Sequence, residues 1–250
     1  MKFRFGNGVR LLPGRWLKVT TGKIYKRKYQ SYQWGAVIDL STGSLDNLIR
    51  IFASEPETHA DTLEGRGPAR YAVIPKLGSI VVKCYKRGGV ISRINKQYYL
   101  KTGAVRSKKE FEFLLAAAKS GASVSKPIAY ASLGGIFYKA WLITEVIEDH
   151  ISFARLSRDK KEKAVTLMPS IARNIRRLIQ NKIHHVDLHP GNILIDKYDR
   201  NYIIDFDKAY YFSGSRDKLT GLYQKRWNKA VHKHRLPEVL TSLPLFQRTP

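Results

Sequence analysis

The pattern of apolar and polar positions predicts three long helices in the chain. Between residues 106 and 120 the apolar residues recur at helical spacing, as Phe111, Leu114, Leu115 and Ala118. Gly121 follows them and is suited to end that helix. A longer apolar stripe lies within 159–181, where Pro169 is expected to kink or divide the helix. A third, basic helix is predicted within 215–235.

Short runs rich in β-branched and aromatic residues predict the strands. The runs at 71–74 and 80–85 are separated by a turn and read as a hairpin. The runs at 193–195 and 202–204 are separated by a turn-prone segment at 197–201 and predict a second hairpin. Additional strand is expected within 124–128 and 137–146.

Residues 1–64 give mixed signals. Apolar runs around Trp16 and Trp34 suggest strands interrupted by glycine and by basic residues. Ser44 is expected to cap a short helix whose apolar positions are Leu45, Leu48, Ile49 and Phe52. The pattern of this segment predicts no function.

Composition narrows the choice of partners. The chain has 250 residues, 43% of them hydrophobic, and can form one two-lobed domain or two small ones. Its 45 Lys and Arg against 20 Asp and Glu leave a net charge of +25. An excess of this size predicts an anionic partner, which can be nucleic acid, an acidic membrane surface or a phosphorylated glycolipid.

Two compositional features bear on location. The single cysteine, Cys84, cannot form an intramolecular disulfide, so a reducing compartment is permitted. The N-terminus lacks an apolar core of signal-peptide length, and no stretch approaches eighteen uninterrupted apolar residues. Any membrane association is therefore expected to be peripheral.

The chemistry is concentrated in residues 184–207. Asp187 and Asn192 stand five residues apart in the frame H-x-D-x-x-x-x-N, and Asp205 follows the predicted hairpin in the tripeptide D-F-D. Phosphoryl transfer from ATP needs a carboxylate beside the acceptor hydroxyl, and an amide and a carboxylate for Mg²⁺. Each residue alone fits an ordinary turn, but their joint spacing around the hairpin favours this chemistry.

This segment resembles the catalytic loop and metal-binding motif of the protein-kinase-like superfamily. It departs from protein kinases at three positions. Val186 replaces the Arg of H-R-D, His189 stands where a Lys is usual, and Asp207 replaces the Gly of D-F-G. These departures resemble small-molecule and lipopolysaccharide kinases.

Together with G-R-G at 65–67 and K-C-Y-K-R-G-G at 83–89, the chain is most similar to the 3-deoxy-D-manno-octulosonic acid (Kdo) kinases of Gram-negative lipopolysaccharide assembly. The resemblance covers roughly residues 65–210. It implies an α+β, bilobal protein-kinase-like fold with a compact C-lobe. The corresponding segments are an N-terminal extension at 1–64, an N-lobe at 65–147, and a C-lobe at 148–250 that contains the basic helix.

The resemblance also assigns catalytic roles. Asp187 would orient or deprotonate the acceptor hydroxyl, and Asn192 and Asp205 would hold Mg²⁺. Lys83, at the end of an apolar strand, would contact the ATP phosphates, with Glu110 holding it in place. The alternatives are a solvent-facing strand lysine and a solvated helix glutamate, and Glu112 is a rival on another helix face.

For the nucleotide itself the resemblance assigns a phosphate-covering loop and an adenine edge. The loop would be formed by Gly65, Arg66 and Gly67, although Arg70 occupies the third glycine position of G-x-G-x-x-G and weakens the motif. The adenine-edge candidates are Glu145 and Ile147, at the junction of the lobes.

The resemblance predicts an ATP- and Mg²⁺-dependent kinase that phosphorylates a sugar hydroxyl of Kdo-lipid A. It would act peripherally at the cytoplasmic face of the inner membrane, with no nucleic-acid partner. The basic residues expected to face an anionic bilayer are Lys218, Lys225, Arg226, Lys229 and Lys233. One alternative is a heptose kinase or another small-molecule kinase of this fold. A protein kinase is disfavoured, because the 43 residues after Asp207 are too few for the helical lobe of a eukaryotic protein kinase. An alternative of another class is a basic nucleic-acid-binding module.

Overall fold

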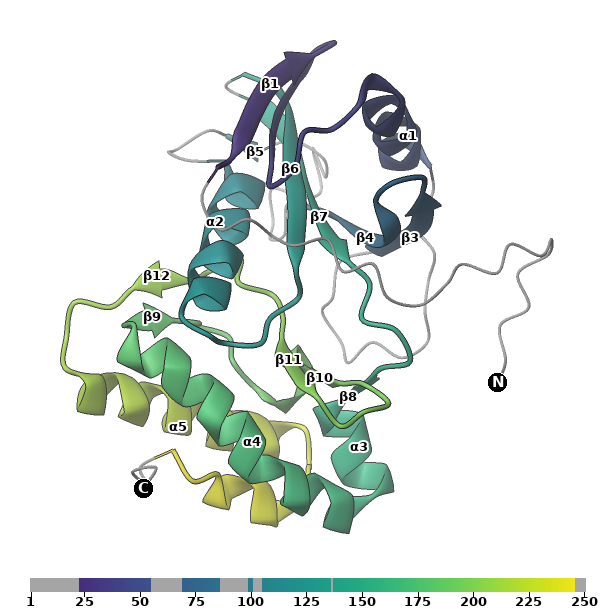
Figure 1. Cartoon of the computed structure of the whole chain (residues 1–250). Coiled ribbons are helices and arrows are strands. Elements are labelled where there is room, and N and C mark those ends of the chain that lie inside the picture. The colour runs from purple at the N-terminus through teal and green to yellow at the C-terminus, as the bar shows by residue number, and fades with distance from the viewer. Residues whose placement is uncertain (1–22, 55–68, 86–98, 101–104, 136, 246–250) are drawn as a thin grey trace.

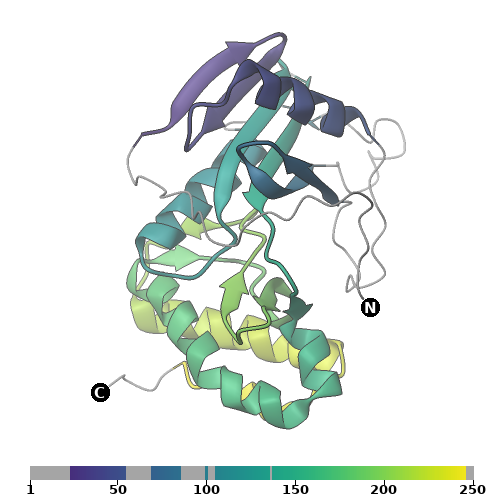
Figure 2. The ribbon, with the colours of Figure 1, turned by 45° about the vertical axis from the view of Figure 1, so that its right-hand side comes forward.

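A computed structural model describes residues 23–54, 69–85, 99–100, 105–135 and 137–245. Figure 1 shows a sheet-rich part above a helical part, and Figure 2, turned by 45°, shows the same division. The protein therefore mixes helices with antiparallel sheets. The phosphate-loop candidates at 65–67 lie outside the described residues.

One antiparallel sheet of seven strands forms the upper part, in the order β1-β2-β6-β7-β4-β3, with β5 also paired to β7. The hairpins predicted at 71–74 and 80–85, and at 193–195 and 202–204, are confirmed as β3–β4 and β10–β11. The strands of the large sheet are β1 (Tyr25–Tyr29), β2 (Tyr32–Ala36), β3 (Ala69–Ile74), β4 (Gly78–Cys84), β5 (Tyr99–Leu100), β6 (Pro127–Gly134) and β7 (Phe137–Glu145).

Helices and short strands make up the rest. The helices are α1 (Thr42–Ala53), α2 (Arg106–Lys119), α3 (Phe153–Asp159), α4 (Lys161–Gln180) and α5 (Arg216–Lys233), with the 3₁₀ turns η2 (Pro190–Asn192) and η3 (Glu238–Ser242). The short strands are β8 (Ile151–Ser152), β9 (Ile183–His184), β10 (Ile193–Ile195), β11 (Asn201–Ile203) and β12 (Tyr210–Tyr211). None of the helices in the described ranges combines the length and apolar character that a bilayer crossing requires.

Three local predictions are corrected. The cap of α1 is Ser41, whose Oγ accepts from the Ser44 N–H at 3.3 Å, while Ser44 is buried inside the helix. Pro169 does not divide α4, which is one helix from 161 to 180, and a kink at Pro169 stays a prediction. Pro169 and Val165, four residues earlier, are both exposed, so the carbonyl freed by the proline can face water. The strand expected at 124–128 begins only at Pro127.

The two faces of the sheet pack against different helices because side chains alternate along each strand. On β7, Trp141 and Ile143 belong to the core that contains α1, whereas Ala140 and Leu142 belong to the core that contains α2. The second core continues downward into α3, α4 and α5. The sheet and the helical part therefore share one apolar interior.

Residues 25–36 form two strands of the large sheet. Strand β2 pairs antiparallel with β6, and β1 pairs with β2 as the edge strand. Lys26, Arg27 and Lys28 are exposed on β1, and lysines on an edge strand disfavour pairing with another chain. The proposed boundary at residue 64 stays a prediction.

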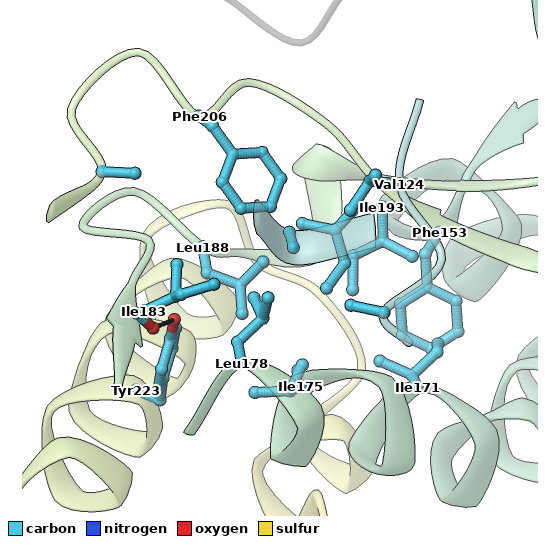
Figure 3. Close-up of a cluster of buried hydrophobic side chains, with 14 of the residues drawn as sticks. Val124, Phe153, Ile171, Ile175, Leu178, Ile183, Leu188, Ile193, Phe206 and Tyr223 are labelled. Carbon is cyan, nitrogen blue, oxygen red and sulfur yellow. Dashed lines mark hydrogen bonds between the residues drawn. The ribbon is translucent and has the colours of Figure 1, made fainter. Parts of the chain in front are cut away.

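The helical core places the segment 184–207. Figure 3 shows Leu188, Ile193 and Phe206 pointing into one apolar cluster with residues of α3 and α4. All three are at most 1% exposed. Each directly follows a polar residue singled out above, so burial of the apolar neighbour fixes the backbone of the polar one.

The ring of Phe52 tests how much α1 contributes to the fold. It stacks on Trp141 with ring centroids 4.4 Å apart and on Trp34 at 5.6 Å. We expect Phe52→Ala to lower the free energy of unfolding by roughly 3–5 kcal/mol, because it leaves a cavity between two indoles. Urea denaturation measures this. Phe137→Ala, at a ring that is 56% exposed, is the matched control and should cost far less.

Candidate active site

Lys83 contacts two carboxylates that come from distant parts of the chain. Its Nζ donates to both carboxylate oxygens of Glu110, at 2.9 and 3.1 Å, and to Oδ1 of Asp205 at 2.5 Å. Lys83 lies on β4, Glu110 on α2, and Asp205 follows β11. The structure thus brings together three of the predicted site residues, and their roles stay predictions.

Burial and charge act in opposite directions in this cluster. Burial lowers the pKa of Lys83, but the carboxylates of Glu110 and Asp205 outweigh it, so its pKa is raised above the ordinary value. Burial raises the pKa of Glu110, whose side chain is almost fully enclosed, while Lys83 opposes that rise. The Lys83 ammonium is therefore charged at neutral pH.

Glu112, the rival of Glu110, faces away from this cluster. Its side chain is 48% exposed and lies 3.8 Å from the Lys108 ammonium one turn earlier. Residues two apart on a helix do not share a face, which explains why only one of the two glutamates reaches the sheet.

Sequence reasoning missed a second layer around Glu110 and the D-F-D tripeptide. The Tyr85 hydroxyl donates a short hydrogen bond to Glu110 Oε2. Arg106, the first residue of α2, donates from Nε to Asp207 Oδ1 at 2.9 Å, and its Nη2 pairs with Oδ2. The guanidinium also lies 5.4 Å from the centre of the Tyr85 ring. Asp207 in place of glycine was the available signal, but its partner could not be read from the pattern.

Asn192 is tied to both neighbours in the candidate site. Its Nδ2 donates to the Asp187 carbonyl at 2.9 Å, and its own carbonyl accepts from the Ile204 N–H at 3.1 Å. The latter bond sets Asn192 beside Asp205. Asp205 has φ +70°, a conformation that non-glycine residues rarely adopt and that marks backbone strain often found at functional sites.

The donor set of Asn192 and Asp205 fits a hard cation. The Asn192 amide nitrogen is used on Asp187, so the amide oxygen remains as a possible ligand beside a carboxylate. Within the described ranges no group of three or more His, Cys, Asp or Glu could hold a metal ion. A cation here would need further oxygen ligands, as from phosphates and water.

Asp187 has a partner that was not expected. Arg226 of α5 donates from Nε to Asp187 Oδ1 at 3.0 Å, and its Nη2 also contacts Oδ1. The prediction that Arg226 faces a bilayer is therefore corrected, since its side chain turns toward the loop that holds Asp187. Sequence position gave no sign of this contact because the two residues are 39 positions apart.

The adenine-edge candidates lie where the chain leaves β7. The Glu145 carboxylate pairs with Lys126 at 3.2 Å, and the Ile147 carbonyl accepts from the His150 ring at 2.5 Å. The intervening Val146 N–H donates to the Ser79 carbonyl at 3.0 Å. Their contact with a nucleotide stays a prediction.

The histidines of the loop are packed. His184 meets the rings of Tyr210 and Tyr223 edge to face, and burial lowers its pKa, as it does for His185. His185 donates from Nε2 to the Ile204 carbonyl at 2.9 Å. His189 accepts from the Gly191 N–H at Nδ1, and burial lowers its pKa to about 4.

Comparisons with known proteins point to one family. The model of the lipopolysaccharide kinase (Kdo/WaaP) family matches residues 52–231. A 3-deoxy-D-manno-octulosonic acid kinase of Vibrio vulnificus is 32% identical over 180 residues, covering 68% of this chain and 75% of the relative. The kinases of that name from Vibrio cholerae and Xylella fastidiosa are each 32% identical, covering 68% and 60% of this chain and 72% and 61% of their own lengths.

His184 leads to a prediction on pH. Its lowered pKa means that the unfolded chain binds a proton more readily, so stability falls as pH drops through about 6.5, the ordinary histidine value. His184 Nδ1 is buried with no hydrogen-bond partner among the described residues. We expect His184→Phe to keep or raise stability at pH 7.5 and to reduce its loss between pH 7 and 5. Urea denaturation between pH 7.5 and 5 measures the free energy of unfolding of both proteins. If that free energy falls with pH as steeply in His184→Phe as in the wild type, His184 is not the group responsible.

Proposed function

Because the chain belongs to the lipopolysaccharide kinase (Kdo/WaaP) family, we propose that it transfers the γ-phosphoryl group of ATP to a sugar hydroxyl of Kdo in Kdo-lipid A. The family and the Kdo kinases among the relatives make it a phosphotransferase that acts on a sugar hydroxyl. The observation that carries the proposal is the contact of Lys83 with both Glu110 and Asp205. It supports a phosphate-binding centre between the sheet and the helices.

In this proposal the sheet-rich part is the N-lobe of a kinase-like fold and the helical part is a compact C-lobe. The chain passes between them after β7, at the adenine-edge candidates Glu145 and Ile147. Gly65, Arg66 and Gly67 would precede β3 as the loop that covers the phosphates. The phosphates of the nucleotide would then lie at Lys83, with the γ-phosphate toward Asp187.

Each residue has one task in the transfer. Glu110 holds the Lys83 ammonium toward the phosphates, where it offsets their negative charge. Asp187 accepts the hydrogen bond of the acceptor hydroxyl and takes its proton as the new oxygen–phosphorus bond forms and the bond from the γ-phosphorus to the leaving ADP breaks. Asn192 and Asp205 would hold Mg²⁺, which, when bound, neutralises charge on the phosphoryl oxygens.

Turnover with purified lipid A precursors, with and without Kdo, tests the function. We expect ATP consumption with the Kdo-containing acceptor, and none above background without Kdo.

Asp187→Ala should reduce kcat about 10²–10⁴-fold with nucleotide binding retained, because this acid contacts the acceptor. Asp205→Asn should weaken Mg²⁺–ATP binding as well, because an amide is a poorer cation ligand.

The exposed Asp159→Asn is the matched control and should keep wild-type turnover. Transfer to acceptors that lack Kdo, at a comparable rate, would refute the proposed substrate. Wild-type turnover in Asp187→Ala would refute the role of Asp187, and an unchanged Mg²⁺ requirement in Asp205→Asn would move the metal role elsewhere.

We also propose that the protein attaches to an anionic membrane surface, on the cytoplasmic side of the inner membrane. The support is the net charge of +25 and the exposed basic side chains of α5, which are Lys218, Lys225, Lys229 and Lys233. Each lysine near an anionic surface contributes about 1 kcal/mol, and the attraction decays within a Debye length of roughly 8 Å at physiological salt.

Vesicle sedimentation measures this attachment. The protein should sediment with anionic vesicles at low salt and be released at high salt without detergent. Reversal of Lys225 and Lys229 to Glu should weaken binding more than it lowers turnover on a detergent-solubilised acceptor. Reversal of Lys26 and Lys28 on β1 to Glu is the matched control. If it weakens vesicle binding as much as reversal of Lys225 and Lys229 does, binding depends on total charge and not on α5. Equal binding to neutral vesicles would contradict charge-driven attachment.

A further inference from the structure

Helix α5 contacts the catalytic loop at two points on one face. The Tyr223 hydroxyl accepts from the His185 N–H and donates to the Ile183 carbonyl, both at 2.8 Å. Three residues later, Arg226 binds the Asp187 carboxylate. Residues three apart are neighbours on a helix surface, so Tyr223 holds the backbone before Asp187 while Arg226 holds its side chain.

The helix that presents Arg226 is itself fixed. Tyr223 and Trp227 are each 1% exposed, and Figure 3 shows the Tyr223 hydroxyl directed at Ile183. The Trp227 indole donates to the Leu240 carbonyl at 2.8 Å. The Arg226 side chain is 28% exposed, whereas its neighbour Lys225 is open to solvent. Arg226 is therefore placed by the core and is not a freely moving surface arginine.

The contact engages one side of the carboxylate. Both Arg226 nitrogens reach Oδ1 of Asp187, and no other group in the described part of the chain hydrogen-bonds this carboxylate. Oδ2 is thus left for another ligand. The Asp187 carbonyl is held separately by Asn192, so backbone and side chain are fixed from two elements.

The loop that holds Asp187 contributes no positive charge near the Asp187 carboxylate. His189, two residues after Asp187, accepts a hydrogen bond at Nδ1, and burial lowers its pKa to about 4, so it is neutral at physiological pH. His234, whose ring centre lies 6.1 Å from that of His189, is the nearby titratable group at the end of α5. Arg226 is the permanent cation bonded to Asp187.

We propose that Arg226 is the positioning residue for Asp187, holding Oδ1 so that Oδ2 faces the acceptor hydroxyl. The inference rests on the proposed function, because it takes Asp187 as the group that receives the proton. Ion pairs this exposed add little to folding stability, so the main effect of the contact is on geometry. A small misplacement of a reacting group is enough to slow a reaction strongly.

Steady-state kinetics on the full chain with detergent-solubilised Kdo-lipid A test the role. Arg226→Gln should lower kcat about a hundredfold, with KM for ATP and for the acceptor within about twofold of wild type. Its melting temperature should fall by only about 2–4 °C. Arg226→Lys, which keeps the charge but loses the second donor, should retain an intermediate kcat. Guanidinium ions should restore part of the activity of Arg226→Ala. Arg216→Gln, at an exposed arginine on the same helix, is the matched control and should keep wild-type kinetics.

A double-mutant comparison shows whether Arg226 acts through Asp187. In the Asp187→Asn background, Arg226→Gln should cause no further loss of kcat. A wild-type kcat in Arg226→Gln would overturn the proposal. So would a raised KM for the acceptor at constant kcat, which would make Arg226 an acceptor-binding residue.

Failure of the proposed function is separable from failure of this inference. If the wild-type protein transfers no phosphate to Kdo-lipid A, the proposed substrate is wrong. The Arg226–Asp187 contact can then still be tested by the melting temperatures of Arg226→Gln, Asp187→Asn and the double variant. Non-additive shifts would support the contact on which positioning depends. Additive shifts would show that Arg226 and Asp187 do not interact in solution, and would overturn the proposal.

Discussion

The arrangement of the site depends on the contacts that the Lys83 ammonium makes with Glu110 and Asp205. Lys83 lies on a strand, and its ammonium binds Glu110 on a helix, 27 residues further along the chain, and Asp205 in the turn after β11, 122 residues further along. A buried carboxylate such as Glu110 is costly unless it is paired. The position of α2 against the sheet and of the D-F-D turn against α2 are therefore coupled through one cation. The Arg106–Asp207 pair fastens the same turn to the first residue of α2.

Apolar packing supplies the precision that charges alone cannot. Asp187, Asn192 and Asp205 are each followed by a residue that is buried in the helical core, namely Leu188, Ile193 and Phe206. A close-packed interior permits few positions for these anchors. The polar atoms are consequently fixed at the core boundary, and the left-handed backbone of Asp205 can persist because its neighbours determine it.

Much of the local structure follows from the sequence because it depends on near neighbours. Helical spacing identified α2, and apolar runs around turn residues identified β3–β4 and β10–β11. The frame of Asp187, Asn192 and Asp205 was visible for the same reason, since a hairpin of known geometry joins them. Contacts set by tertiary packing were not visible. Arg226 reads as one basic residue among several on α5, and only the rotation of that helix in the core turns it toward Asp187. The pairing of β2 with β6 spans about a hundred residues and has no local signature.

Asp207 has a consequence for how the site can be controlled. A glycine at this position would leave the turn after Phe206 free to rotate, since glycine tolerates many backbone conformations. Here an aspartate is fixed by a two-pronged contact with Arg106, and its side chain is only 13% exposed. Any excursion of Asp205 away from Lys83 must first break that contact and expose a charge to a poorly hydrated space. The Arg106–Asp207 contact therefore opposes rotation of the turn that carries Asp205, which a glycine at position 207 would not do.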